Sequence, residues 1–116
     1  MTSATMPQTF DEWTTWIDHA VKAHKVVMFA KGEKGAPQCG FSNRAMQILD
    51  ACNVPYEVHN VLAAPGMREA LVKYSNWPTT PQVFVDGRLI GGCDIVTEMF
   101  QNGDLKKILD ETLKVN

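Results

Sequence analysis

Cys39 is the residue of this chain whose type and position best suit chemistry. It opens the stretch Cys39-Gly40-Phe41-Ser42, directly after the loop expected at residues 31–38 and at the expected start of a helix. Free backbone N–H groups and the positive end of the helix dipole stabilise an anion there, so the pKa of the thiol should fall. Lys31, at the end of the preceding expected strand, adds a positive charge. The alternative is a buried structural cysteine, and the position, the preceding loop and the small Gly40 favour the reactive thiol.

Ser42 stands three residues after this cysteine, where a dithiol oxidoreductase carries its second thiol. That second thiol resolves a mixed disulfide, and a hydroxyl group cannot do so. The pattern therefore predicts that Cys39 forms mixed disulfides with an outside thiol, or binds a metal together with outside ligands.

Thr80-Pro81 is a second candidate, because a proline between a loop and the start of a strand is often a cis peptide. A cis bond would leave the backbone N–H and C=O groups of Thr80 free to pair with an extended peptide. The fragment by itself favours an ordinary trans proline, so both readings stay open at this point.

Gly91-Gly92-Cys93-Asp94 forms a third candidate, at another expected helix start. The backbone N–H groups there can hold a carboxylate, and Asp94 can accept a hydrogen bond from an ammonium group. Asp94 could equally cap its own helix. Cys93 either fills the core or lies near enough to Cys39 to pair with it under oxidation.

The other chemically active side chains carry weaker signals. Arg68 and Lys73 lie on one expected helix, where they form a solvated face or reach a ligand carboxylate. Cys52 is expected in the core, on the apolar side of the helix that Cys39 begins. The histidines share no metal-ligand spacing and are expected at the surface: His19, His24 and His59.

The elements that must position these residues are predicted from the spacing of apolar residues and from the residues that begin or end helices and strands. A Thr9-x-x-Glu12 capping box starts the first helix. Further expected elements are a strand at 26–30, a helix from 39–40 to Asn53, a strand at 56–61, a helix at 66–74, a hairpin of strands 82–85 and 88–90, a helix at 94–100, and a last helix capped by Asp104. We expect Phe41, on the apolar face of the second helix, to pack in the core or at its rim. The order predicts an α/β fold: a mixed four-stranded sheet flanked by helices on both faces, its first two strands parallel.

Composition narrows the functional class. The 116 residues are 45% hydrophobic and 21% charged with a net charge of −2, which suits one domain over residues 1–116 and argues against nucleic-acid binding. No apolar run is long enough to span a membrane, and we expect no signal peptide. The three cysteines are an odd number without a Cys-x-x-Cys pair, which indicates a reducing intracellular compartment.

The motifs in order closely resemble the monothiol, CGFS-type glutaredoxins of the short, single-domain class. The resemblance covers nearly the whole chain and rests on Lys31-Gly32, Pro37, Cys39-Gly40-Phe41-Ser42, Trp77-Pro78-Thr79-Thr80-Pro81-Gln82 and Gly91-Gly92-Cys93-Asp94. It implies the thioredoxin fold and a single glutaredoxin domain. One position departs from the family pattern: Thr80 stands where a bulkier apolar side chain is common, so the rim of the site should be more polar.

The resemblance also implies a ligand and a cargo. Such proteins bind glutathione and share a [2Fe-2S] cluster between two protomers, each supplying its motif cysteine and one glutathione thiolate. Cys39 would be the iron ligand. The protein would be a homodimer with the cluster bound and a monomer without it. The implied glutathione contacts are Lys31, Arg68 and Lys73 at the glycine carboxylate, Thr80 and Pro81 at the cysteinyl part, and Cys93 and Asp94 at the γ-glutamyl end.

Three functions remain open from the sequence. The first is a carrier that passes the cluster to apo iron-sulfur proteins. The second is an enzyme, a glutathione-dependent thiol-disulfide oxidoreductase of low activity. The third is an iron sensor in a cluster-bridged complex with a BolA-type partner. The expected location is the cytoplasm for a bacterial protein, or the mitochondrial matrix for a processed eukaryotic one.

Overall fold

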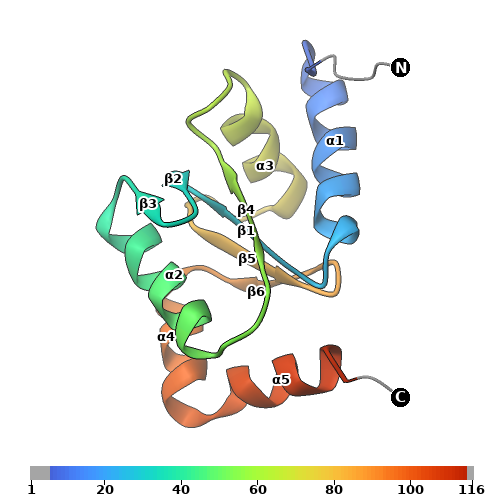
Figure 1. The fold of residues 1–116 in the computed structure, drawn as a ribbon. Coiled ribbons are helices and arrows are strands. Elements are labelled where there is room, and N and C mark those ends of the chain that lie inside the picture. The colour runs from blue at the N-terminus through green and yellow to red at the C-terminus, as the bar shows by residue number, and fades with distance from the viewer. Residues whose placement is uncertain (1–5, 115–116) are drawn as a thin grey trace.

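The computed structural model describes residues 6–114 (Figure 1). Its elements in chain order are α1 (Phe10–Ala23), β1 (Val26–Ala30), β2 (Gly32–Glu33), β3 (Ala36–Pro37), α2 (Gly40–Ala51), β4 (Glu57–Asn60), α3 (Met67–Ser75), β5 (Gln82–Val85), β6 (Arg88–Gly91), α4 (Cys93–Asn102) and α5 (Asp104–Thr112). None of these helices is long and apolar enough to cross a bilayer.

The main sheet has four strands in the order β4-β1-β5-β6. Strand β1 pairs in parallel with β4, whereas β5 is antiparallel to both β1 and β6. All five residues of β1 are buried, as its apolar run without alternation predicts for a central strand. The structure therefore confirms the mixed four-stranded sheet and its parallel first pair.

Helices cover both faces of this sheet, α1 and α3 on one and α2, α4 and α5 on the other (Figure 1). Because side chains alternate along a strand, β1 feeds both layers. Val27 and Phe29 pack under α1 and α3, while Val26 and Met28 pack toward α2 and α5. Full burial of each such side chain contributes about 1.5–3 kcal/mol.

The capping box at the start of α1 is present, as predicted. Thr9 Oγ1 accepts from the Glu12 N–H (3.1 Å), and Glu12 Oε1 accepts from the Thr9 N–H (3.1 Å). At the other end of the chain, Asp104 is the first residue of α5 rather than its cap. The prediction there was wrong because the Asn102 side chain already accepts from the Asp104 N–H (2.8 Å), and Gly103 turns the chain.

Residues 31–38 are not an irregular loop, as the sequence suggested. They fold into the short antiparallel hairpin β2–β3, in which Gly32 faces Pro37 and Glu33 faces Ala36. Two-residue strands leave no periodic signal, and the glycines that suggested a loop supply the positive φ angles of a tight hairpin. The hairpin connects the end of β1 to the start of α2.

The structure decides the position of Phe41 and corrects that of His59. Phe41 is 64% exposed, so it lies at the rim and not in the core. His59 is half-buried rather than on the surface: its ring lies 5.0 Å from that of Trp16 and 5.2 Å from that of Phe29. Burial lowers the pKa of His59.

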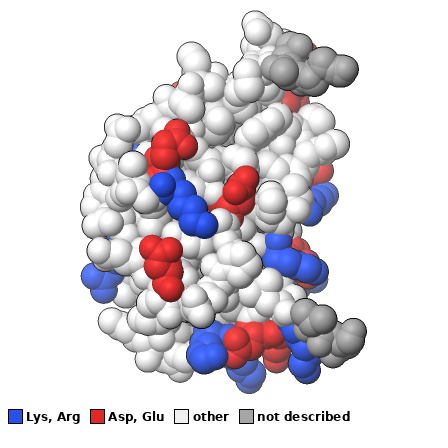
Figure 2. Space-filling model, viewed as in Figure 1, with Lys and Arg blue, Asp and Glu red and all other residues white. Residues whose placement is uncertain are grey.

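Charges are mixed on the face seen in Figure 2, where acidic and basic side chains alternate most densely over α5. Lys106 and Asp110, one turn apart on α5, form an ion pair of 2.9 Å there. Exposed pairs of this kind contribute only a few tenths of a kcal/mol. The charged surface on this face is therefore neither a basic nor an acidic field.

Candidate functional site

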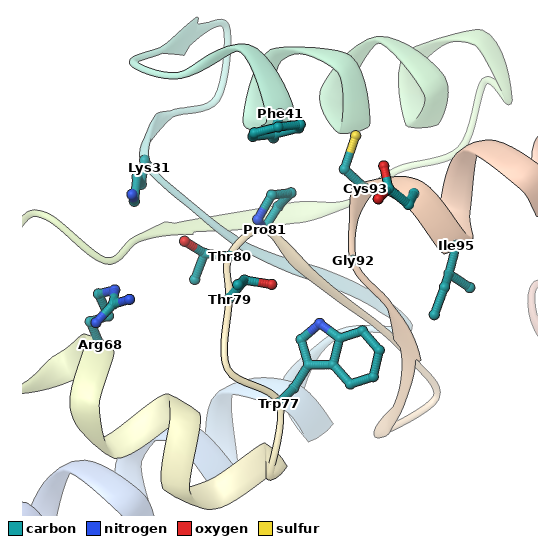
Figure 3. A pocket seen from close by; sticks show the side chains of 11 residues that line it. Lys31, Phe41, Arg68, Trp77, Thr79, Thr80, Pro81, Gly92, Cys93 and Ile95 are labelled. Carbon is teal, nitrogen blue, oxygen red and sulfur yellow. The ribbon is translucent and has the colours of Figure 1, made fainter.

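A cavity of about 390 Å³ lies where the first turns of α2, α3 and α4 approach the loop before β5 (Figure 3). Its walls come from segments far apart in the chain. The lining residues are Lys31, Phe41, Arg68, Trp77, Thr79, Thr80, Pro81, Gly92, Cys93, Asp94 and Ile95. Its volume falls in the range of small-molecule sites in proteins.

The cavity gathers most of the residues that were predicted to bind a ligand: Lys31, Arg68, Thr80, Pro81, Cys93 and Asp94. Lys73 is not in the lining, because it lies more than one turn beyond Arg68, exposed in the last turn of α3. Its role stays a prediction. Cys39 is also outside the lining, but it begins the helix whose Phe41 forms one wall.

Sequence reasoning missed part of this wall. Phe41, Thr79 and Ile95 line the cavity and were not predicted as site residues. Phe41 and Ile95 are large apolar side chains that stay exposed, at 64% and 38%. Their exposure beside a cavity is the signal that identifies them, and it exists only in the folded chain.

Cys39 is the N-cap residue of α2, a position usually held by a serine, threonine or aspartate. Its sulfur takes the place of the capping oxygen: Sγ accepts from the Ser42 N–H at 3.3 Å. The Cys39 thiol and Ser42 Oγ are also 3.3 Å apart, within hydrogen-bond distance. A half-buried thiol in this position faces the donor groups of a helix start.

Several effects determine the pKa of Cys39. Partial burial raises it, but hydrogen bonds from the Ser42 hydroxyl and from the backbone N–H groups of Ser42 and Phe41 lower it, and the Lys31 charge lowers it further. The net result is a pKa below the ordinary value of a thiol. The thiolate that the sequence predicted is therefore favoured by local donors more than by the lysine.

Ser42 has a structural role that the sequence did not reveal. The residue is fully buried, and its Oγ accepts from the Lys31 N–H at 3.0 Å. The hydroxyl thus joins the end of β1 to the first turn of α2 while it also contacts Cys39. It holds the lysine and the cysteine in a constant relation to each other.

Replacing Ser42 with alanine is expected to raise the pKa of Cys39, because the thiolate loses a hydroxyl donor. Alkylation requires the thiolate, so the midpoint of the Cys39 alkylation rate against pH should move to higher pH. Peptide mass spectrometry after timed iodoacetamide labelling measures it. Cys52, whose pKa burial raises, is the internal control; an unchanged Cys39 midpoint would contradict this account of the thiolate.

The peptide bond between Thr80 and Pro81 is cis, as the resemblance implied and the isolated fragment did not. The loop that carries it is held by Gln82, the fully buried first residue of β5. Gln82 Nε2 donates to the carbonyl oxygens of Trp77 and Thr79, each at 3.1 Å. Sequence reasoning missed this role, although a polar residue in the apolar run 82–85 was a signal for it.

The start of α4 lies against this loop. Gly92 is the N-cap residue, and a Cβ added to it would lie 3.1 Å from the Pro81 carbonyl oxygen. Since glycine has no capping side chain, no side chain caps α4, and Asp94 lies exposed in the first turn. The open alternative for Asp94, a helix cap, is not what the structure shows.

Opposite charges face the cavity from its two sides. Figure 3 shows Lys31 and Arg68 on one side and Cys93 and Ile95 on the other, with Asp94 between the latter two in sequence. The cationic side suits a carboxylate. The other side combines free N–H groups of a helix start with a carboxylate, which suits a group carrying both a negative and a positive charge.

The cysteines are all free thiols in the structure. Cys93 is buried, with its Sγ 4.0 Å from Thr97 Oγ1, and its pairing with Cys39 stays a prediction. Cys52 packs against the core at the C-terminal end of α2, as predicted. Within residues 6–114 no three His, Cys, Asp or Glu side chains gather in a group that could hold a metal ion.

Comparisons with known proteins show the family of this chain. Residues 26–90 match the glutaredoxin family model. The chain is 50% identical over 97 residues to a protein of Synechocystis named "Uncharacterized monothiol glutaredoxin ycf64-like", which covers 84% of this chain and 91% of that protein. It is 55% identical over 97 residues to the chloroplastic "Bifunctional monothiol glutaredoxin-S16" of Arabidopsis thaliana, covering 81% of this chain but 33% of the relative.

A solved structure shows the same fold. The solution structure of reduced poplar apo GrxS14 superposes with a TM-score of 0.76 at 44% identity, over 85% of this chain and 91% of that one. The fold, the site motif and the family match agree, and the thioredoxin fold predicted from the sequence is confirmed. The chain belongs to the glutaredoxin family and, within it, to the monothiol glutaredoxins.

Proposed function

We propose that this protein binds glutathione in the cavity and, with a second copy, carries a [2Fe-2S] cluster that it transfers to apo iron-sulfur proteins. The observation that carries the proposal is the single stabilised thiol of Cys39, beside a ligand cavity and with Ser42 in place of a second thiol. A protein with one thiolate per chain must complete any four-sulfur site from outside.

Glutathione matches the charges of the cavity. The tripeptide has a glycine carboxylate at one end and an α-amino acid group at the other, with the thiol between them. Lys31 and Arg68 are suited to the first, and the start of α4 with Asp94 to the second. The backbone of Thr80, beside Pro81, would pair with the cysteinyl part, and the ligand thiol would then lie toward Cys39.

The cluster is cargo rather than a resident group, and its ligands follow from the count of thiolates. A [2Fe-2S] centre takes four sulfur ligands. Among the described residues, no three His, Cys, Asp or Glu side chains of one chain gather in a group that could hold a metal ion. Two Cys39 thiolates and two glutathione thiolates supply the four ligands, so the loaded form is a homodimer and the empty form a monomer.

The lowered pKa of Cys39 favours a second function, glutathione-dependent reduction of mixed disulfides. In that reaction the Cys39 thiolate would attack the glutathione sulfur of a mixed disulfide and displace the client thiolate. The thiolate of a free glutathione would then attack the resulting Cys39–glutathione disulfide, which releases the Cys39 thiolate and glutathione disulfide. We expect low turnover, because Ser42 stands where a dithiol oxidoreductase carries its second thiol. High turnover in a glutathione-coupled disulfide assay would favour this function over cluster transfer.

Anaerobic reconstitution with iron, sulfide and glutathione tests the carrier proposal. The expected product is a coloured dimer with charge-transfer absorption, eluting at twice the size of the 12.9 kDa chain. Omission of glutathione should leave the protein colourless and monomeric. The proposal would be wrong if wild type and Cys93→Ser both stayed colourless monomers with glutathione present.

The proposal extends to a partner and a compartment. A complex with a BolA-type partner would use the same cluster site and would make the protein an iron sensor. We propose a reducing compartment because free thiols are maintained there. The relatives include bacterial and chloroplastic proteins. We also propose that residues 1–116 act as one glutaredoxin domain.

A further inference from the structure

We infer that Asn60 is a positioning residue for the cavity: its side-chain amide holds hairpin β2–β3, and through it Lys31, in a constant place against the sheet. Asn60 is the last residue of β4 and lies opposite Ala30 of β1. It does not line the cavity. The inference therefore concerns how the site is held rather than what touches the ligand.

The Asn60 side chain makes three hydrogen bonds at the base of the hairpin. Its Oδ1 accepts from the Gly32 N–H at 3.0 Å and from the Leu62 N–H at 2.9 Å. Its Nδ2 donates to Glu33 Oε2 at 3.0 Å. One amide thus ties both residues of β2 to the end of β4.

Gly32 directly follows Lys31, so this tie fixes the main chain from which the lysine side chain extends. On the other side, the Lys31 N–H donates to Ser42 Oγ at 3.0 Å, and the Lys31 carbonyl accepts from the Gln38 N–H at 2.8 Å. The Lys31 backbone therefore lies between a contact from α2 and a contact that depends on Asn60 of β4.

A second anchor keeps the hairpin folded without Asn60. Lys34, in the hairpin turn, donates to the Tyr56 carbonyl oxygen at 2.9 Å, and its ammonium group lies 4.0 Å from the centre of the Tyr56 ring. Removal of the Asn60 amide should therefore loosen the base of the hairpin while the tip stays attached. This makes the role of Asn60 testable in a folded protein.

The consequence for binding rests on the proposed function. If Lys31 meets the glycine carboxylate of glutathione, this contact contributes most to binding when the Lys31 backbone is already held in place. A more mobile Lys31 backbone loses more conformational entropy on binding, which lowers the affinity without removing any group that contacts the ligand. Asn60 would then affect glutathione only through Lys31.

Hydrogen–deuterium exchange on the unliganded protein tests whether the Asn60 amide holds hairpin β2–β3. In Asn60→Ala the amides of Gly32 and Gln38 should exchange faster than in wild type, while those of α5 stay unchanged. Asn60→Asp combined with Glu33→Gln keeps an acceptor for the Gly32 N–H and an amide–carboxylate pair at the position of Glu33, and should keep exchange of the Gly32 amide slow. The matched control is Asn102→Ala, which removes a similar amide-to-backbone bond of 2.8 Å at the start of α5 and should change exchange only there.

Glutathione titration calorimetry with a double-mutant cycle tests the link to Lys31. Asn60→Ala should weaken binding about tenfold, equivalent to about 1.4 kcal/mol, whereas in a Lys31→Met background it should add little. Slow exchange at Gly32 in Asn60→Ala, or additive losses with Lys31→Met, would overturn the inference. A wild type that does not bind glutathione would refute the proposed function instead. The exchange experiment needs no ligand and would still test the role of Asn60.

Discussion

Cys39→Ser is expected to abolish cluster assembly completely, because a serine hydroxyl stays protonated and does not replace a thiolate as an iron ligand. In the proposed loaded dimer, Cys39 supplies the one sulfur ligand that each chain contributes. Cys52 caps the opposite end of the 12-residue helix α2, about 20 Å away along its axis. Burial raises the pKa of Cys52, which disfavours the thiolate that iron requires.

Absorbance after anaerobic reconstitution with glutathione, combined with size-exclusion chromatography, measures this effect. Cys39→Ser should remain a colourless monomer, and Cys52→Ser should give the coloured dimer of the wild type. A folded Cys39→Ser protein with a normal spectrum would show that the cluster ligand lies elsewhere. Loss of colour in Cys52→Ser would show that the structural role assigned to Cys52 is wrong.

Gly32→Ala is the substitution with the largest expected effect on stability. Gly32 has a φ of +112°, and a Cβ added there would lie 2.6 Å from the Ala36 carbonyl oxygen and 2.7 Å from the Gln38 nitrogen. Both neighbours are backbone atoms of the hairpin, which cannot move without breaking its hydrogen bonds. We expect a loss of about 2–4 kcal/mol in the free energy of unfolding, from backbone strain and the clash together.

Gly35→Ala is the matched control in the turn of the same hairpin. Gly35 also has a positive φ of +81°, but nothing lies within 4 Å of an added Cβ. It should therefore lose only the conformational part, about 1 kcal/mol. Chemical denaturation compares the two, and equal losses would contradict the close packing of Gly32. Glutathione affinity should fall only in Gly32→Ala, because the residue adjoins Lys31.

The order of elements and the class of fold were predictable because they depend on local signals. The Thr9–Glu12 capping box and the apolar run 26–30 each belong to one segment and are satisfied within it. The same holds for Cys39, whose position at a helix start follows from the residues on either side. Helix starts and central strands could therefore be placed without tertiary contacts.

The environment of a side chain was less predictable. Phe41 fitted the apolar face of α2 by spacing, yet the first turn of that helix extends past the sheet and leaves it exposed beside the cavity. His59 looked like a surface residue, yet α1 covers its face of β4. Periodicity indicates which side of an element is apolar, but not where its neighbours end.

By itself, the sequence determined the single thiol at a helix start, the absence of a resolving thiol at Ser42 and the chain order of the four main-sheet strands, since each follows from neighbouring residues. Only the tertiary structure decided that Ser42 bonds to the Lys31 backbone, that Gln82 holds the loop before Pro81 and that Asn60 ties down the hairpin. These bonds join segments up to 28 residues apart. A polar side chain carries no mark of which distant backbone group it will meet, because that choice depends on how the layers pack.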